Sequence, residues 1–301
     1  MKKIIAVAGG TGNLGERIVK ALLDQGAEVR ALVRSNTNLK KVNRLEKLGA
    51  KVIKADMQNT AEVAAACKGA TCVVSALAGL RDVIIDTQKI LLDAAIAAEV
   101  PRFIPSDYSL DFTKFPDGEN RNLDLRREFH TYLDTKPIAA TTIFNGAFTD
   151  LLTDQMPLIV FKHKLVLYWG DADHRLWFTT MDDTATFTAH AALDPSTPRF
   201  LVIAGDQRSP REIRADVSDV TGEKFRLLRA GGPGLLSLFI KLARTFSPAK
   251  NDLYPAWQGM QYMRNMIDKR ANLTTTDNNR YSGMQWTSVK KMLSEPQANS
   301  K

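Results

Sequence analysis

Residues 3–20 read KIIAVAGGTGNLGERIVK, and this stretch decides the fold. An apolar run at 4–8 is followed by a glycine-rich turn at 9–15 and by an amphipathic segment at 16–20. This pattern is typical of a buried parallel strand that enters a helix through a phosphate-binding turn.

The glycines of this turn fit two registers, Gly9-x-x-Gly12-x-x-Gly15 and Gly10-x-Gly12-x-x-Gly15. In both, one glycine makes the tight turn, one lets the backbone approach a pyrophosphate, and Gly15 lets helix and strand pack closely. The free N–H groups at the helix start then hold the anion. The alternative is a purely structural turn, but a second strand at 28–33 favours dinucleotide binding. The predicted contacts are Gly9, Thr11, Gly12, Asn13, Leu14 and Gly15.

The alternation of strand and helix continues beyond this turn. Further strands are predicted at 28–33, 51–55, 71–75, 102–104 and 138–144, with helices at 39–48, 60–66, 83–98 and 119–134. Such alternation favours right-handed crossovers and a parallel sheet covered on both faces. The sequence therefore predicts an α/β Rossmann fold, a doubly wound parallel sheet of order 3-2-1-4-5-6, with a smaller α+β C-terminal substrate lobe.

A ligand crevice is expected where the strand order reverses, between the first and fourth strands. Turns at 75–80, 105–108 and 145–148 follow other strands of the same sheet and should surround one cofactor. The predicted cofactor contacts on them are Ser75, Ala76, Pro105, Ser106 and Asn145.

The end of the second strand predicts which nucleotide is bound. An NAD-preferring site places an acidic residue there to bind the ribose 2′-OH, whereas this chain has Arg34. A guanidinium can form charge-assisted hydrogen bonds to a 2′-phosphate, so NADP(H) is the predicted cofactor. The alternative is an exposed arginine that merely ends a strand. Asp56 and Met57, after the third strand, are predicted to flank the adenine.

From residue 158 the alternation weakens. Short strands are predicted at 158–161, 165–169, 175–180, 199–203 and 224–229, with helices at 182–193, 208–220, 233–245 and 255–270. We expect a Rossmann domain over residues 1–155 and a substrate lobe over 156–301, interleaved and without a linker. Trp257 begins an apolar stripe at helical spacing, which favours packing in the lobe over direct ligand contact.

Composition restricts the class of protein. The chain has 301 residues, 44% of them apolar, and no apolar run of about 18 residues, so we expect a cytoplasmic protein that does not bind a membrane. Cys67 and Cys72 are predicted to be reduced, and the four histidines have no metal-ligand spacing, so no metal is expected. The net charge of +8 is spread along the chain and does not require a nucleic-acid partner.

Several segments together resemble the atypical short-chain dehydrogenase/reductase group that contains the NmrA-like proteins and the isoflavone and pinoresinol-lariciresinol reductases. They are the glycine turn, Val33-Arg34, VPRFIPSDY at 100–108, NGAF at 145–148 and FTTMDD at 178–183. The resemblance covers the chain from the first strand to about residue 185. It implies an NADP(H)-binding Rossmann domain with a small substrate lobe.

The same resemblance raises a question about catalysis. The reductases carry a lysine three residues before an Ile-Arg-Arg-like segment, and the matching position before Leu125-Arg126-Arg127 is Asn122. Tyr108 and Lys114 are the substitute donors that we consider. Tyr132 and Lys136 match a Tyr-x-x-x-Lys pair, but 13 residues of helix would carry Tyr132 about 20 Å from the crevice.

Two functions remain open. One is an NADPH-dependent reductase of a small carbonyl, enone or quinone, whose predicted substrate contacts are Asp107, Phe112, Phe148 and Trp257. The other is a non-catalytic redox sensor that binds NADP(H) and regulates a partner protein. Either would work as a monomer or homodimer with a small-molecule or protein partner.

Overall fold

The computed structural model describes residues 2–153, 156 and 158–295. The chain folds into two compact units, which are interleaved along the sequence. Unit 1 comprises residues 1–108, 122–144 and 184–201, and unit 2 comprises residues 109–121, 145–183 and 202–301. The domain boundary predicted between residues 155 and 156 involves residue 155, which lies outside the described residues.

Unit 1 contains the predicted doubly wound sheet, with the order β3-β2-β1-β4-β5-β6 and parallel pairing throughout. The strands are β1 (Ile4–Ala8), β2 (Glu28–Val33), β3 (Lys51–Lys54), β4 (Cys72–Ser75), β5 (Arg102–Ile104) and β6 (Ala139–Ala140). The predicted fold class and strand order are therefore confirmed.

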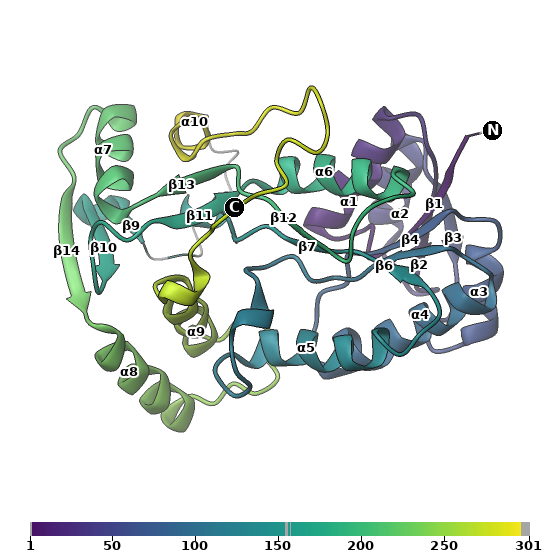
Figure 1. Cartoon of the computed structure of the whole chain (residues 1–301), viewed down its shortest axis with the longest axis horizontal. Coiled ribbons are helices and arrows are strands. Elements are labelled where there is room, and N and C mark those ends of the chain that lie inside the picture. Colours follow the sequence, from purple (N-terminus) through teal and green to yellow (C-terminus); the bar gives the residue numbers. More distant parts are fainter. Residues whose placement is uncertain (1, 154–155, 157, 296–301) are drawn as a thin grey trace. The chain divides into compact units, whose positions relative to one another are not determined.

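Helices cover both faces of this sheet. They are α1 (Asn13–Asp24), α2 (Leu39–Leu48), α3 (Thr60–Cys67), α4 (Gln88–Ala97), α5 (Arg121–Leu133) and α6 (Met181–Leu193). In Figure 1, α4 and α5 run along one side of the sheet, and α1 and α6 along the other. The helix predicted at 83–98 begins with a π-helical turn, Asp82–Thr87.

The prediction of one continuous sixth strand at 138–144 was wrong. It divides into β6 and β7 (Thr142–Phe144), and β7 pairs with β12 (Phe200–Val202) in a separate two-stranded sheet. The backbone changes partner at this point, because the N–H of Thr141 donates to Phe103 O (3.0 Å) whereas that of Thr142 donates to Arg199 O (2.8 Å).

Unit 2 is built on two three-stranded sheets, of order β14-β10-β9 and β13-β11-β8. Their strands are β8 (Ala147–Phe148), β9 (Ile159–Val160), β10 (Leu165–Trp169), β11 (Leu176–Thr179), β13 (Asp206–Arg208) and β14 (Arg226–Gly231). The helices are α7 (Pro210–Thr221), α8 (Pro233–Phe246), α9 (Ala256–Met266) and α10 (Val289–Ser294).

Sequence reading missed three elements of unit 2, namely β8, β13 and α10. Strand β13 is Asp-Gln-Arg, which has no strand propensity of its own, and it exists because it pairs antiparallel with β11. The sequence did contain a start signal for α10, because serine is a typical N-cap residue. The Ser288 side chain accepts a hydrogen bond from the Lys291 N–H. The helix predicted at 255–270 ends earlier, at Met266.

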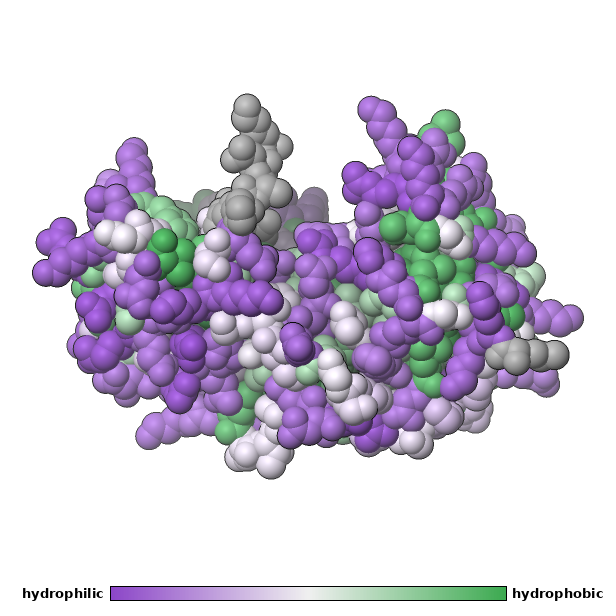
Figure 2. Space-filling view, turned by 90° about the horizontal axis from the view of Figure 1, so that it is seen from above, coloured by the Kyte–Doolittle hydropathy of each residue, from purple (hydrophilic) through white to green (hydrophobic). Residues whose placement is uncertain are grey.

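The core of unit 1 contains both cysteines. Cys67 and Cys72 are buried free thiols, and burial raises the pKa of each to about 12. Hydrophilic residues cover most of the face seen in Figure 2, with apolar patches between them. Within the described ranges, no helix is long and apolar enough to cross a membrane, and no three His, Cys, Asp or Glu residues are grouped to hold a metal ion.

Candidate functional site

The turn after β1 is packed so closely that side chains are excluded from two of its positions. Gly9 has a φ of +84°, and a Cβ added there would lie 2.5 Å from the carbonyl oxygen of Ala76. A Cβ on Gly15 would lie 2.1 Å from the carbonyl oxygen of Gly9. Both glycines are therefore required by backbone packing within unit 1, which is the role predicted for Gly15.

The first turn of α1 carries the donors that an anion needs. Gly12 is the N-cap residue, and no side chain forms a cap hydrogen bond at this helix start. The Asn13 side chain instead accepts a hydrogen bond from Arg17. The backbone N–H groups at 13–15 are thus left for a ligand, and the helix dipole adds positive potential there. A glycine cradle with uncapped amides fits the pyrophosphate of a dinucleotide.

Arg34 lies directly after β2, at the same sheet edge as the glycine turn. The register pairs Ala8 of β1 with Leu32 of β2, so Arg34 follows two residues beyond this pair. Its side chain is exposed, and no carboxylate in the described chain pairs with it. Its guanidinium is therefore available to a phosphate.

The two residues predicted to flank the adenine have different environments. Asp56 is exposed, and its Oδ1 accepts a hydrogen bond from the Gln58 N–H at 2.9 Å. Met57 is buried in the apolar core of unit 1. Its packing against an adenine ring stays a prediction.

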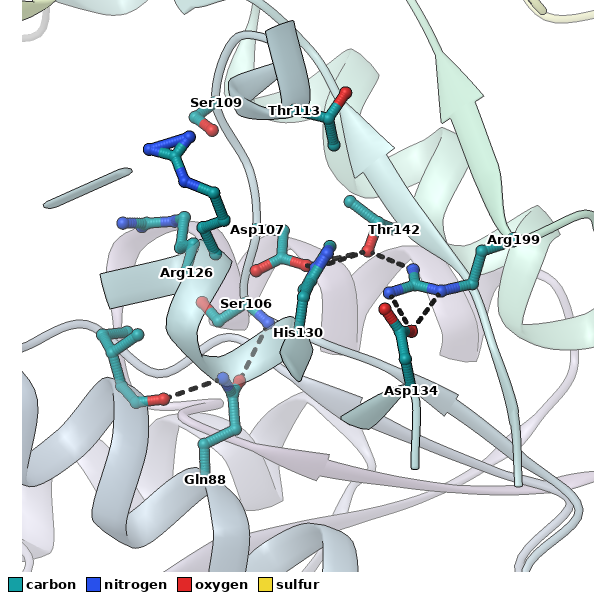
Figure 3. A network of polar contacts seen from close by, with 12 residues as sticks. Gln88, Ser106, Asp107, Ser109, Thr113, Arg126, His130, Asp134, Thr142 and Arg199 are labelled. Carbon is teal, nitrogen blue, oxygen red and sulfur yellow. Dashed lines mark hydrogen bonds and ion pairs between the residues drawn. The ribbon is translucent and has the colours of Figure 1, made fainter. Parts of the chain in front are cut away.

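The turns after β4 and β5 are joined through one serine. Ser106 donates from its N–H to Gln88 Oε1 (2.9 Å, Figure 3) and from its hydroxyl to the carbonyl oxygen of Leu77 (2.6 Å). Ser75 ends β4, is fully buried, and has no hydrogen-bond partner for its Oγ in the described chain. Pro105 is also buried. Ser106 thus holds the two turns together, and contact between the Ser75 hydroxyl and a ligand stays a prediction.

Asp107 is the centre of a buried polar network (Figure 3). Its Oδ2 lies 2.6 Å from Nε2 of His130 on α5 and accepts a hydrogen bond of 2.8 Å from the Thr142 hydroxyl on β7. Arg199 donates to the Thr142 hydroxyl (2.8 Å) and pairs with Asp134 (2.9 Å). Because an ionised carboxylate only accepts, Nε2 of His130 carries the proton in this contact.

The electrostatics of this network favour an ionised Asp107. Burial by itself would raise the pKa of Asp107, but His130, Arg126 and Thr142 together hold it below its ordinary value of 3.8. The carboxylate was predicted to bind substrate; within unit 1 it contacts His130 and Thr142, and substrate contact stays a prediction. The network connects β5, α5 and β7, so it positions the turn that carries Ser106.

The two predicted proton donors differ in accessibility. Tyr108 is buried in unit 1, and burial raises its pKa above the ordinary value for tyrosine. Lys114, in unit 2, keeps part of its side chain in solvent and lies 3.7 Å from the Asp111 carboxylate. Solvent access therefore favours Lys114 as a donor over Tyr108.

Unit 2 carries the other predicted site residues. Asn145 is fully buried, and neither its Oδ1 nor its Nδ2 has a hydrogen-bond partner in the described chain. Such an orphaned amide is what a ligand-binding position would leave. Phe112 and Trp257 are buried, whereas Phe148 is half-buried in β8.

Two further residues considered for catalysis, Asn122 and Tyr132, lie on α5, and Lys136 follows the end of this helix. Asn122, at the position of the family lysine, is buried. Tyr132 donates from its hydroxyl to Asp93 (2.6 Å), and Lys136 pairs with the same aspartate (2.9 Å). This arrangement gives Tyr132 and Lys136 a structural role, and the absence of a catalytic role for this pair stays a prediction.

Sequence reasoning missed His130, Thr142 and Arg199 as members of one network. His130 was noted only as a histidine without metal-ligand spacing. The available signal was a pair of polar residues, Thr141 and Thr142, inside an otherwise apolar predicted strand. A buried threonine in such a strand needs a hydrogen-bond partner, and the partner of Thr142 is Asp107.

Comparison with known proteins gives consistent matches. A model of the NmrA-like family matches residues 1–268. Pinoresinol reductase 2 of Arabidopsis thaliana is 32% identical over an alignment of 213 residues, and the match covers 65% of this chain and 66% of that protein. The matched region thus spans slightly less than two thirds of this relative's length.

Two solved structures show the same fold. A structure of AtPrR2 with NADP+ and (+)-pinoresinol has a TM-score of 0.82 at 20% identity and covers 98% of both chains. An NADPH-dependent quinone oxidoreductase from Escherichia coli has a TM-score of 0.76 at 18% identity, covering 96% of this chain and 98% of that one.

Proposed function

This chain belongs to the NmrA-like family, and from that premise we propose that it is an NADPH-dependent reductase of a small carbonyl, enone or quinone compound. The observation that carries the proposal is the glycine cradle, in which Gly9 and Gly15 leave no room for a Cβ and the start of α1 has no side-chain cap. Relatives that are reductases and neighbours with bound NADP+ support the same reading.

In this proposal, the residues of the cradle bind and orient the cofactor. Backbone N–H groups at 13–15 hold the pyrophosphate, and Arg34 holds the 2′-phosphate, which selects NADP(H) over NAD(H). Ser75 and Asn145 supply polar groups that the described chain leaves without partners. When bound, the reduced nicotinamide supplies a hydride.

The proton at the substrate oxygen comes from a group of this chain or from solvent. Lys114 is the better candidate, because Tyr108 is buried with a raised pKa. Quinone reduction can use solvent protons, so it tolerates Asn122 in place of the family lysine better than reduction of an unactivated substrate would.

The second candidate is a redox sensor that binds NADP(H) and regulates a partner protein without turnover. Asn122 favours it, since an amide cannot serve as the acid or base. Under this alternative, the buried Asp107 network would keep only its structural role.

One assay separates the two. The protein is incubated with NADPH and a panel of quinones, enones and aldehydes while absorbance at 340 nm is followed. The reductase predicts oxidation with at least one acceptor, and Lys114→Met should lower the rate for enones and aldehydes more than for quinones. If NADPH is not oxidised with any acceptor, and if the affinities for NADP+ and NADPH clearly differ, the redox-sensor function would take the place of the reductase function.

A further inference from the structure

Unit 2 contains an open pocket of about 360 Å³, and one of its lining residues, Trp257, is also a predicted substrate contact. Three of the five residues that line it are cationic and none is acidic; they are Arg121, Arg244, Pro248, Lys250 and Trp257. The pocket lies wholly within unit 2, whereas the glycine cradle lies wholly within unit 1.

Arg121 builds one wall of this pocket. Its guanidinium lies 4.7 Å from the centroid of the Trp257 ring. It donates to the carbonyl oxygens of Lys250 (3.2 Å), Asp252 (2.9 Å) and Leu253 (2.8 Å). These bonds order the backbone of the loop at 250–253, which brings the exposed Lys250 to the pocket lining.

Arg244 brings a second guanidinium to the same indole, at 5.3 Å from the ring centroid. The Trp257 ring is itself held, because its Nε1 donates to the carbonyl oxygen of Pro248 at 3.0 Å. In the ranges that the structure describes, neither Arg244 nor Lys250 forms an ion pair with a carboxylate. Arg244 and Lys250 thus bring two exposed cations to the pocket beside Arg121, whose own charge also interacts with the nearby Asp252 carboxylate.

Like charges held this close repel one another, and a bound anion would remove that repulsion. A guanidinium forms paired hydrogen bonds with phosphate oxygens, and a lysine ammonium adds a point charge. The volume is larger than one phosphate ion needs and lies in the range of small-ligand pockets. Pro248, which is exposed, offers apolar surface to an organic group, whereas the buried Trp257 ring is contacted by the guanidinium groups of Arg121 and Arg244.

We propose that this pocket binds the phosphate group of an organic phosphate monoester, with Arg244 and Lys250 on the phosphate and Pro248 against the organic part. The phosphate can belong to a free small molecule or to a lipid headgroup. Arg121 positions Lys250 and adds its charge.

The test is isothermal titration calorimetry with phenyl phosphate at constant ionic strength. NADP+ is present at saturation, so that phenyl phosphate cannot occupy the cofactor's phosphate positions. We expect one saturable site per chain. Arg244→Gln and Lys250→Gln should each weaken binding about tenfold, as expected for the loss of a charged hydrogen bond. Phenol, which lacks the phosphate, should not bind.

Lys241→Gln is the matched control, because Lys241 is an exposed cation on the same helix, α8, outside the pocket lining. It removes the same charge and should leave affinity unchanged. Thermal unfolding of each variant confirms that it is folded. The double variant Arg244→Gln/Lys250→Gln should abolish binding.

A second arm uses vesicles of phosphatidylcholine with and without phosphatidic acid. Binding that requires phosphatidic acid and is lost in the double variant would assign the phosphate to a lipid, whereas binding of phenyl phosphate alone would assign it to a soluble ester. The proposal is overturned if neither probe binds, or if Lys241→Gln weakens binding as much as Lys250→Gln does.

Discussion

The two units each bury a polar network, but they use different chemistry to do so. In unit 1 the network is charged, with Asp107 between His130 and the Thr142 hydroxyl. In unit 2 its centre is made of neutral amides: Asn120 donates to Asn265 (3.0 Å) and accepts from Gln258 (2.7 Å), and Asn265 donates in turn to the Glu119 carboxylate (3.3 Å). Both networks join distant parts of the sequence.

This difference between a charged and a neutral network predicts different losses of folding stability when one partner is removed. A buried charge that loses its partner is far more destabilising than an amide that loses one, because the remaining charge has no solvent to stabilise it. The amides at the centre of the unit 2 network also do not titrate. The network of unit 1 should therefore be sensitive to both mutation and acid, and the amides of unit 2 mainly to mutation.

The largest effect is expected for Asp107→Ala. It removes the carboxylate that His130 and Arg126 face, and should lower the free energy of unfolding by about 3–5 kcal/mol. Chemical denaturation measures this change. The control is Asp134→Ala, which removes the exposed carboxylate paired with Arg199 and should cost about 1 kcal/mol or less. Equal costs for the two variants would mean that burial of the charge is not what matters.

Asn120→Ala should follow, at about 1–3 kcal/mol. It leaves the Gln258 Nε2 and the Asn265 Oδ1 without the partners that Asn120 provides. Asn279→Ala, which truncates an exposed asparagine of the same unit, is the control and should change little. A cost for Asn120→Ala above that of Asp107→Ala would reverse the comparison.

The pH dependence distinguishes the networks further. The pKa of Asp107 is lowered in the folded chain, so the stability it contributes is complete above its unfolded pKa and is lost as pH falls toward the folded pKa. We expect the difference in unfolding free energy between wild type and Asp107→Asn to shrink when pH is lowered from about 6 to about 3. The corresponding difference for Asn120→Ala should stay constant. A constant difference for Asp107→Asn would show that ionisation is irrelevant.

The smallest effect is expected for Tyr132→Phe, which lies outside both networks. The variant loses one partly buried hydrogen bond to Asp93, worth about 0.5–1.5 kcal/mol, and should oxidise NADPH at the wild-type rate. Loss of turnover in a folded Tyr132→Phe variant would return Tyr132 and Lys136 to the catalytic candidates.

These networks also mark the limit of prediction from sequence. The sheet of unit 1 could be predicted because each strand and helix is specified by local patterns, such as the apolar run at 4–8 and the Asn38 cap before α2. The glycine turn could be predicted because its chemistry lies in consecutive residues.

The rest depends on contacts between distant residues. His130 is 23 positions from Asp107, and Asn120 is 145 positions from Asn265, so no local pattern reveals either pair. The division of 138–144 into β6 and β7 depends on Arg199, which is also distant. Strand β13 exists only through its pairing with β11.

The central claim is that the glycine cradle and Arg34 bind NADP(H), and the ratio of the dissociation constants for NADPH and NADH tests it most directly. We predict that the wild type prefers NADPH and that Arg34→Asp weakens NADPH binding about tenfold or more while leaving NADH binding nearly unchanged. Equal losses for both nucleotides, or no binding of either by the wild type, would contradict it.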